Sequence, residues 1–194
     1  LSGTGCIDLG DVLFRPTTQQ LDLSAETICQ PATFSHKEEE ASAGYYSVIL
    51  KEEGIKAELT ATAHVGVHRY TFPVGKEASV IIDLAHLLDN EHIYEATLKQ
   101  TTDHEVAGMR RTRGWTDNQY VYFVAQFSKP FKSVDFIQDR KIVPADAGLT
   151  GTDLQAVVTF ASDDNEPVVA KIGLSVVSEE NARKNLETEV KGFD

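Results

Sequence analysis

Ile55-Lys56-Ala57-Glu58-Leu59-Thr60-Ala61-Thr62-Ala63 alternates apolar and polar side chains over nine residues without a break. Successive side chains of a β-strand point to opposite faces, so the odd positions are expected to face a core and the even ones water. Residues 45–50 form a second expected strand. The polar segment Lys51-Glu52-Glu53-Gly54 between the two is typical of a hairpin turn. The fold therefore starts from a β-hairpin.

Similar short patterns recur along the rest of the chain. Further strands are expected at residues 7–16, 65–72, 78–84, 93–101, 104–112, 119–127, 133–138, 154–161 and 168–177. Asp163-Asp164-Asn165-Glu166 is interpreted as a hairpin turn between the last two, since it lacks the glycine and distal glutamate of a calcium loop. The acidic run Lys37-Glu38-Glu39-Glu40 is interpreted as a solvated loop. Short strands at regular spacing predict an all-β sandwich or barrel.

One helix is expected, at the end of the chain. Ser178 is a suitable N-cap, followed by two glutamates, and Gly192 is a plausible C′ residue. Ala182, Leu186 and Val190 form a narrow apolar stripe, which suggests a linker that leans on a surface outside this chain. Residues 120–127 are apolar on both faces, so the sandwich is either large or covered by a partner.

Composition limits the possible functions. The 194 residues include 18 basic and 30 acidic side chains, a net charge of −12, which argues against binding nucleic acid or an anionic membrane through a basic patch. Apolar residues make up 41% and charged residues 25%, as in ordinary globular proteins. No apolar run reaches the ~18 residues of a membrane span. Leu1 to Cys6 has no leader character, so the chain is expected to be trimmed or processed.

Few residues form a pattern that indicates chemistry. His64 and His68 lie on one expected strand, roughly 13 Å apart, which disfavours a shared metal ion and favours separate hydrogen bonds. A Cys6–Cys29 bridge is possible, but two cysteines make no disulfide framework. The segment Arg110-Arg111-Thr112-Arg113-Gly114-Trp115 could bind a sugar through Trp115 or an anion through the arginines. Alternatively, the arginines pair with acids at a strand edge and Trp115 fills the core.

Several stretches together resemble the N-terminal domain of glycoside hydrolase family 92, the calcium-dependent exo-acting α-mannosidases. They occur in the family order: Leu1-Ser2-Gly3-Thr4-Gly5-Cys6-Ile7-Asp8-Leu9-Gly10-Asp11, Phe34-Ser35-His36, Glu40-Ala41-Ser42-Ala43-Gly44-Tyr45-Tyr46, residues 55–62, His68-Arg69-Tyr70-Thr71-Phe72-Pro73, residues 108–115 with Gln119 and Val121-Tyr122-Phe123, Phe127-Ser128-Lys129-Pro130-Phe131, and Asn181-Ala182-Arg183-Lys184-Asn185-Leu186-Glu187. Three departures stand within these stretches: Ala43 for a frequent Pro, Lys37-Glu38 for an acidic–polar pair, and Ile7 for a frequent Gly.

The resemblance implies a large β-sandwich of the galactose-mutarotase-like supersandwich type at residues 1–177. It also implies a linker helix at 178–194 that leads to an (α/α) barrel absent from this chain. The family's domain begins earlier than Leu1, and its catalytic carboxylates and calcium ligands belong to the barrel. We therefore predict calcium in the parent enzyme and no catalytic or metal-binding residue here. The implied reaction is hydrolysis of a terminal α-mannoside, in N-glycans or mannan, with inversion.

Within this chain, Thr4, Gly5 and Cys6 are the predicted substrate-binding residues, because a loop of small residues permits close approach of a sugar or a partner domain. The alternative is a tight turn in which Cys6 is a small buried apolar residue. The expected partners are the catalytic domain of the same protein and a mannose-containing glycan. The resemblance implies a secreted or periplasmic location, or the outer surface of a bacterium. A freestanding carbohydrate-binding module and a structural or adhesive β-sandwich remain the alternatives.

Overall fold

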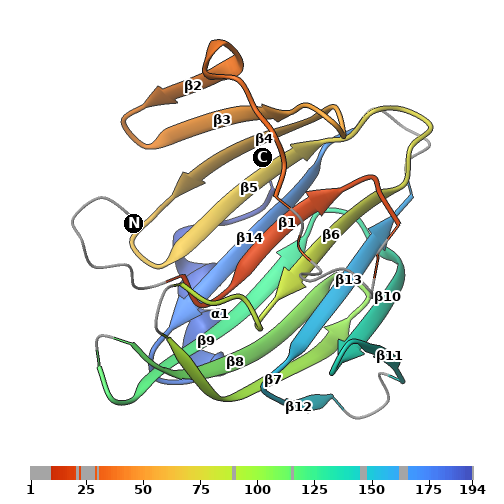
Figure 1. The fold of residues 1–194 in the computed structure, drawn as a ribbon. Helices are drawn as coiled ribbons and strands as arrows, with labels where there is room; N and C mark the ends of the chain where they lie inside the picture. Colours follow the sequence, from red (N-terminus) through yellow and green to blue (C-terminus); the bar gives the residue numbers. More distant parts are fainter. Residues whose placement is uncertain are drawn as a thin grey trace.

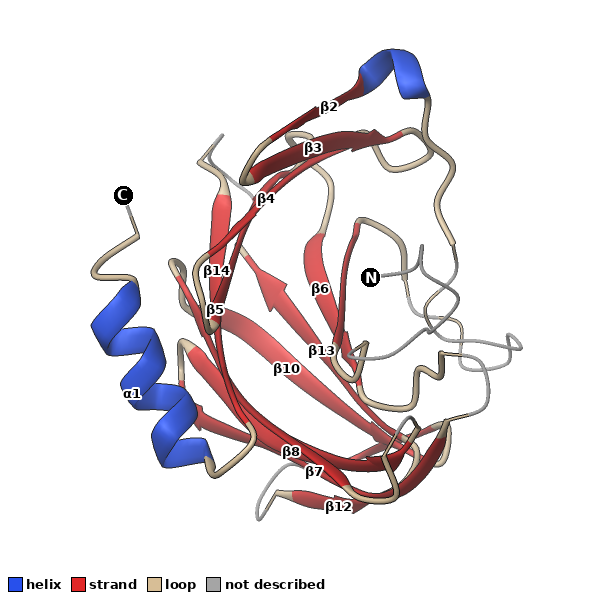
Figure 2. Ribbon diagram, turned by 90° about the vertical axis from the view of Figure 1, so that its left-hand side faces the viewer, coloured by secondary structure: helices blue, strands red, loops and turns tan. Residues whose placement is uncertain are grey.

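The computed structural model describes residues 10–20, 22, 29, 31–88, 91–114, 116–144, 148–161 and 166–193. Within these residues, fourteen strands form two antiparallel sheets that face each other, and one α-helix lies outside the larger sheet (Figures 1 and 2). The predicted all-β sandwich is confirmed. No helix of this described part is long and apolar enough to span a bilayer.

The larger sheet has nine strands. In spatial order they are β12 (Leu149–Gly151), β7 (His92–Thr102), β8 (Glu105–Arg113), β9 (Gln119–Phe127), β14 (Val168–Ser175), β5 (Val65–Thr71), β4 (Ile55–Ala61), β3 (Tyr45–Leu50) and β2 (Glu39–Ser42). The hairpin deduced from residues 45–63 is present as β3 and β4, with Tyr46 opposite Leu59. Figure 2 shows the strong curvature of this sheet around the smaller one.

The smaller sheet has five strands. In spatial order they are β1 (Leu13–Thr17), β6 (Ala78–Asp83), β13 (Leu154–Phe160), β10 (Phe131–Gln138) and β11 (Lys141–Val143). All six residues of β6 are buried, which suits a strand paired on both sides and covered on both faces. Between the sheets, large side chains such as Ile82, Phe123, Phe136 and Phe160 form the main core.

Three short strands were not predicted. The acidic run expected as a solvated loop instead forms a 3-10 turn, η1 (His36–Glu38), and the start of β2, which pairs with β3. Strands β11 and β12 are three residues each, too short to show alternation. The hairpin predicted around residues 163–166 is wrong, because β13 and β14 belong to different sheets. Residues 162–165 themselves lie outside the described part.

The helix α1 (Glu179–Glu189) begins as predicted, with Ser178 Oγ accepting the Asn181 amide at 3.1 Å. It ends at Glu189, one residue earlier than a C′ position at Gly192 implies. Ala182 and Leu186 are buried against the outer face of the larger sheet, with Val65, Ala107 and Val124. The expectation that this stripe leans on a surface outside the chain is therefore corrected: α1 packs on its own domain (Figure 2).

This helix also explains part of the strand that is apolar on both faces. In β9, Phe123, Ala125 and Phe127 point into the main core, whereas Val124 lies under α1. Tyr120, also on the outer face, stays partly exposed. Gly173 of β14 lets the helix approach closely, since a Cβ added there would lie 2.3 Å from the Ala182 carbonyl oxygen.

Candidate functional site

One end of the sandwich gathers the start or end of several strands from both sheets. In the smaller sheet, Asp83 at the end of β6 pairs with Leu13 on one side and Gln155 on the other. In the larger sheet, His92 at the start of β7 pairs with Arg113, and Thr112 pairs with Gln119. Hydrogen bonds from β8 and β9 to Asp11, just before β1, join these two groups, so they form one end of the molecule. We call it the loop end.

A buried polar network connects the sheets at the loop end. Arg110 of β8 is fully buried, and its Nη1 donates to the Asp11 carbonyl at 2.8 Å while its Nη2 donates to Glu91 Oε2 at 3.1 Å. The Asp11 carboxylate accepts from Thr112 Oγ1 at 3.0 Å and from Gln119 Nε2 at 2.8 Å. The network thereby ties the segment before β1 to strands β8 and β9.

The charges of this network depend on one another. Burial lowers the pKa of Arg110, whereas Asp11 and Glu91 raise it. A guanidinium stays protonated in proteins, so Arg110 is a buried cation held by two nearly buried carboxylates. Two atoms of the network, Glu91 Oε1 and Arg110 Nε, are buried without a hydrogen-bond partner. Such a network fixes the geometry of the loop end and leaves acceptor capacity at Glu91.

A mostly apolar cavity of about 820 Å³ opens beside Asp11. Its wall combines side chains of β1, β5, β9 and β14 with the segment leading into α1: Phe14, His68, Val121, Ile172, Leu174 and Val177. Burial lowers the pKa of His68 to about 4, so its ring is neutral at pH 7, and its Nδ1 lies 2.7 Å from Tyr70 Oη. The cavity suits apolar side chains or the flat face of a neutral ligand better than an ion.

The predicted substrate-binding residues Thr4, Gly5 and Cys6 lie outside the described residues, as does Trp115. Gly10 and Asp11 of the same quoted stretch are described, and Asp11 reaches the network. Cys29 takes no part in a disulfide. Burial and the neighbouring Asp83 raise the pKa of its thiol.

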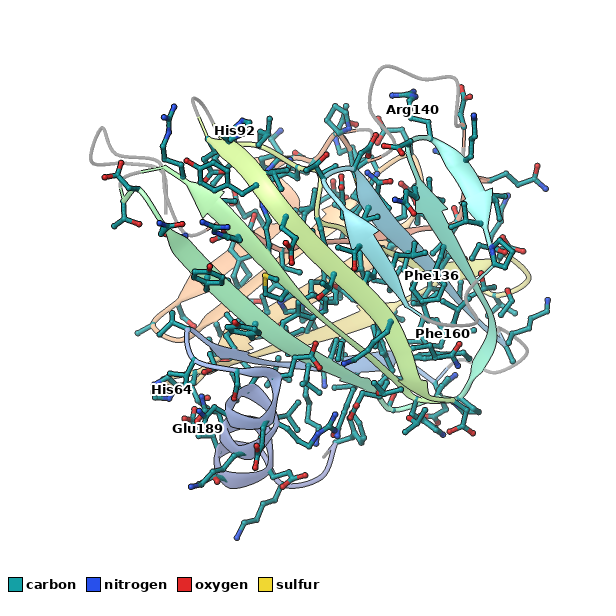
Figure 3. The ribbon with its side chains drawn as sticks, turned by 90° about the horizontal axis from the view of Figure 1, so that it is seen from below. His64, His92, Phe136, Arg140, Phe160 and Glu189 are labelled. Carbon is teal, nitrogen blue, oxygen red and sulfur yellow. The ribbon has the colours of Figure 1, made fainter. Side chains whose placement is uncertain are left out.

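The two histidines singled out by spacing have separate partners. His64 Nδ1 lies 2.6 Å from Glu189 Oε1 at the end of α1, and Figure 3 labels both residues, whereas His68 contacts Tyr70. Separate hydrogen bonds are therefore confirmed for the pair. Among the residues that the structure describes, no group of three or more His, Cys, Asp or Glu is arranged to hold a metal ion.

The arginine segment divides between the two faces of β8, as strand geometry predicts. Arg110 pairs with buried acids inside, but β8 is an interior strand of the sheet and not an edge. Outside, the Arg111 guanidinium lies 5.0 Å from the Tyr94 ring centre and 5.4 Å from that of Tyr120, and also binds Asn118. The ring of Tyr120 stacks on Tyr122 with centres 6.3 Å apart. Tyr94 and Tyr120 are still 40% and 37% exposed, so part of this aromatic surface stays open on the outer face.

Sequence reasoning missed Glu91, Gln119 and Gln155 as residues of the loop end. One signal was available: Arg110 shares the inward face of β8 with Gly108 and Thr112, and an arginine pointing into a core requires buried carboxylates. Which carboxylates these are depends on how the strands pair, and that information is not local.

Comparison with known proteins identifies the domain. The model of the glycosyl hydrolase family 92 N-terminal domain matches residues 1–175. The chain belongs to this family. The resemblance deduced from the quoted stretches is thereby confirmed, together with the supersandwich fold.

Solved structures of family 92 enzymes share this fold. A family 92 α-mannosidase from Bacteroides thetaiotaomicron superposes with a TM-score of 0.88 at 34% sequence identity, over 98% of this chain and 28% of its own. A family 92 inverting mannosidase from the same organism gives 0.76 at 23% identity, over 94% of this chain and 24% of its own, which supports the fold alone.

A secreted glycosidase of Arthroderma benhamiae is 28% identical over 174 residues, covering 78% of this chain and 22% of its own length. The chain thus spans between a fifth and a third of the length of these relatives. A glycosidase parent is supported on this basis.

Proposed function

We propose that this family 92 domain is the N-terminal part of a longer, exo-acting and inverting α-mannosidase that hydrolyses terminal α-mannosides of glycans such as N-glycans or mannan. The observation that carries the proposal is the similarity to an α-mannosidase at 34% identity and a TM-score of 0.88 over nearly the whole chain. Inversion is proposed because a family 92 relative is an inverting mannosidase. Inverting glycosidases keep two carboxyl groups roughly 6.5–9.5 Å apart to admit a water molecule, and we place both in the barrel.

In this proposal the loop end packs on the catalytic (α/α) barrel and helps to shape the −1 pocket, with Thr4, Gly5 and Cys6 near the sugar. Apolar exposure supports this arrangement. Val176 and Val177, between β14 and α1, are 73% and 66% exposed, and Leu174 beside them is 39% exposed. Leu174 and both valines line the 820 Å³ cavity next to Asp11. Contiguous exposed apolar surface of this kind is typical of an interface.

Calcium is proposed for the parent enzyme with its ligands outside this chain. The described residues do not fit a calcium site, since they hold no suitable group of three or more ligating side chains. We therefore derive no step through calcium here. We also propose a secreted or periplasmic location, or the outer surface of a bacterium. The secreted relative supports export from the cell.

The experiment compares the 194-residue chain with a longer protein extended at both ends, on a synthetic α-mannoside and the matching α-glucoside. We expect only the longer protein to release the aglycone, only from the mannoside, and a calcium chelator to stop it. The first sugar anomer formed, followed by NMR, should be the β-anomer if the reaction inverts.

A different result would favour another function. If the longer protein were inert and the 194-residue chain bound mannan, the carbohydrate-binding module would replace the enzyme. If neither protein bound or cleaved a mannoside, a structural or adhesive role of the β-sandwich would be the remaining hypothesis.

A further inference from the structure

A second hollow of about 610 Å³ opens at the loop end, on the side of β6 and β7. The end of β6, the start of β7 and the turns β10–β11 and β12–β13 form its wall. Its polar lining includes Asp83, Glu91, His92, Arg140, Asp153 and Gln155. Figure 3 labels His92 and Arg140 at this end of the molecule. Its size is within the usual range for small-ligand sites, roughly 300–1,000 Å³.

Gln155, in the wall of this hollow, carries a fixed acceptor. Its side chain is only 3% exposed, and its Nε2 donates to Asp83 Oδ1 at 3.2 Å and to Asp153 Oδ1 at 2.8 Å. Both N–H groups are thus used by carboxylates, which accept only, so the amide cannot turn over without facing oxygen to oxygen. Oε1 is therefore an acceptor, and it is buried without a partner.

Glu91 presents another such acceptor. It is 8% exposed, and its Oε2 accepts the Leu88 amide and Arg110 Nη2, both at 3.1 Å. Its Oε1 has no hydrogen-bond partner. The strands and the buried cation Arg110 hold Glu91 in place, so this oxygen is preorganised in the hollow's wall.

These acceptors define the chemistry of an occupant. A buried acceptor without a donor is unfavourable, so an occupant that brings hydroxyl donors is stabilised there. The lining includes the three carboxylates of Asp83, Glu91 and Asp153 but one guanidinium, that of Arg140, and this balance disfavours an anion. The described lining offers no group arranged for a metal ion. A neutral polyhydroxylated molecule fits these conditions.

We propose that this hollow binds one neutral hexopyranose unit of a glycan, with sugar hydroxyls donating to Gln155 Oε1 and Glu91 Oε1. The choice of a sugar among neutral polyols rests on the function proposed above.

The test is calorimetric and NMR titration of the 194-residue chain with methyl α-D-mannopyranoside and α-1,2-mannobiose, with glycerol and CaCl₂ as comparison ligands. Gln155→Met keeps the length of the side chain and removes the acceptor. Thr152→Phe places a ring at the exposed rim of the hollow, and Thr150→Phe makes the same change at an exposed residue outside the lining. We expect mannoside binding to be weaker by about tenfold or more in Gln155→Met and in Thr152→Phe. Thr150→Phe should bind the mannoside as the wild type does.

Thermal unfolding shows whether each variant is folded, and Thr152→Phe carries the test if Gln155→Met is not. The inference is overturned if the wild-type chain binds no hexoside at millimolar concentration, which leaves the hollow to water alone. It is also overturned if calcium or glycerol binds as well as the mannoside, or if both variants bind like the wild type.

Assaying the longer protein separates this inference from the proposed function. If the longer protein cleaves an α-mannoside but no sugar binds at the hollow, only the inference of a sugar site in the hollow is overturned. Sugar binding at the hollow in a longer protein that cleaves no mannoside overturns only the enzyme function.

Discussion

Gly173 shows at the scale of one residue how the helix and sheet fit together. A Cβ at this position would lie 2.3 Å from the Ala182 carbonyl oxygen and 2.8 Å from Leu186 Cβ, both in α1. Gly173→Ala should therefore push α1 away from the sheet and lower the free energy of unfolding by about 1–3 kcal/mol. Urea denaturation followed by circular dichroism measures this.

Gly66 provides the matched control on the neighbouring strand. A Cβ there meets nothing nearer than His68 Nε2 at 3.6 Å, an ordinary contact. Gly66→Ala should be neutral or slightly stabilising. Equal losses for the two alanine variants would contradict the close helix–sheet contact.

Arg110 tests the buried network. Replacing it with leucine leaves the carboxylates of Asp11 and Glu91 in a buried site without their cation. We expect Arg110→Leu to lower the free energy of unfolding by about 3–5 kcal/mol, as for other broken buried ion pairs. Arg111→Leu, one residue away on the outer face, should change it by less than about 1 kcal/mol. Chemical denaturation of both variants measures these changes. A small loss of unfolding free energy in Arg110→Leu would mean that the network is not a buried ionic one.

The nature of a residue's neighbours is what the sequence alone leaves open. The alternation in β8 correctly separates Arg110 from Arg111, because strand period depends only on local order. It does not reveal that Asp11, almost a hundred positions earlier, and Glu91 are the partners of Arg110. Those contacts arise from strand order, as does the orientation of Gln155.

At the scale of elements, the end of α1 is held by Glu189. Its carboxylate accepts from Thr62 Oγ1 at 2.5 Å and the His64 amide at 3.0 Å, and these bonds with the His64 ring lower the pKa of Glu189 to about 2. The carboxylate form is therefore stabilised in the folded state. Its contribution to stability is present above the unfolded pKa of about 4.5 and is lost as pH falls toward 2.

Thermal midpoints measured between pH 6 and pH 2, at about one-unit steps, test this contact. We expect Glu189→Gln to unfold at a lower temperature than the wild type near pH 6, and the difference to disappear as the pH approaches 2. Glu187→Gln, an exposed glutamate of the same helix, is the control for the change of charge. A difference that stays constant down to pH 2 would argue against a role for the Glu189 carboxylate.

The longer elements were predictable and the shortest were not. Strand β9 (Gln119–Phe127) and the N-cap at Ser178 lie where the sequence pattern indicates. Strands β11 and β12 exist because longer neighbours, β10 and β7, offer them open edges. A segment of three residues is too short for its sequence pattern to predict a strand. The pairing of β13 and β14 with different sheets also depends on the whole topology.

At the scale of the molecule, the proposed interface with a catalytic domain makes Val176 and Val177 decisive. Replacing both with aspartate should change the free energy of unfolding of the 194-residue chain by less than about 0.5 kcal/mol per site, because both are exposed. In the longer protein the same change should weaken domain packing, by about 1.5–3 kcal/mol for each valine removed from an apolar contact. α-Mannosidase activity and the thermal midpoint of the longer protein measure the effect.

Ile142→Asp is the matched control, since Ile142 is 60% exposed on the far edge strand β11. It should affect neither protein. Equal behaviour of the valine and isoleucine variants in the longer protein would place the domain interface elsewhere.

The family and the sandwich could be predicted from the sequence because quoted stretches and strand alternation run along most of the chain. The site could be predicted only in part. Asp11 lies in the first stretch that resembles the family. The hollow beside Gln155 and Glu91 is built from four separate segments, and the tertiary fold alone brings them together.

The attachment of α1 has a consequence for how the domain orients what is joined to it. Ser178 caps the helix shortly after β14, Glu189 holds its last turn to Thr62 and His64, and Lys171 donates to the Val190 carbonyl at 3.3 Å. The helix is therefore held to the sandwich at both ends and should not rotate independently of it. A fluorophore attached just after it would report the tumbling of the entire sandwich, and its anisotropy would show little independent wobble.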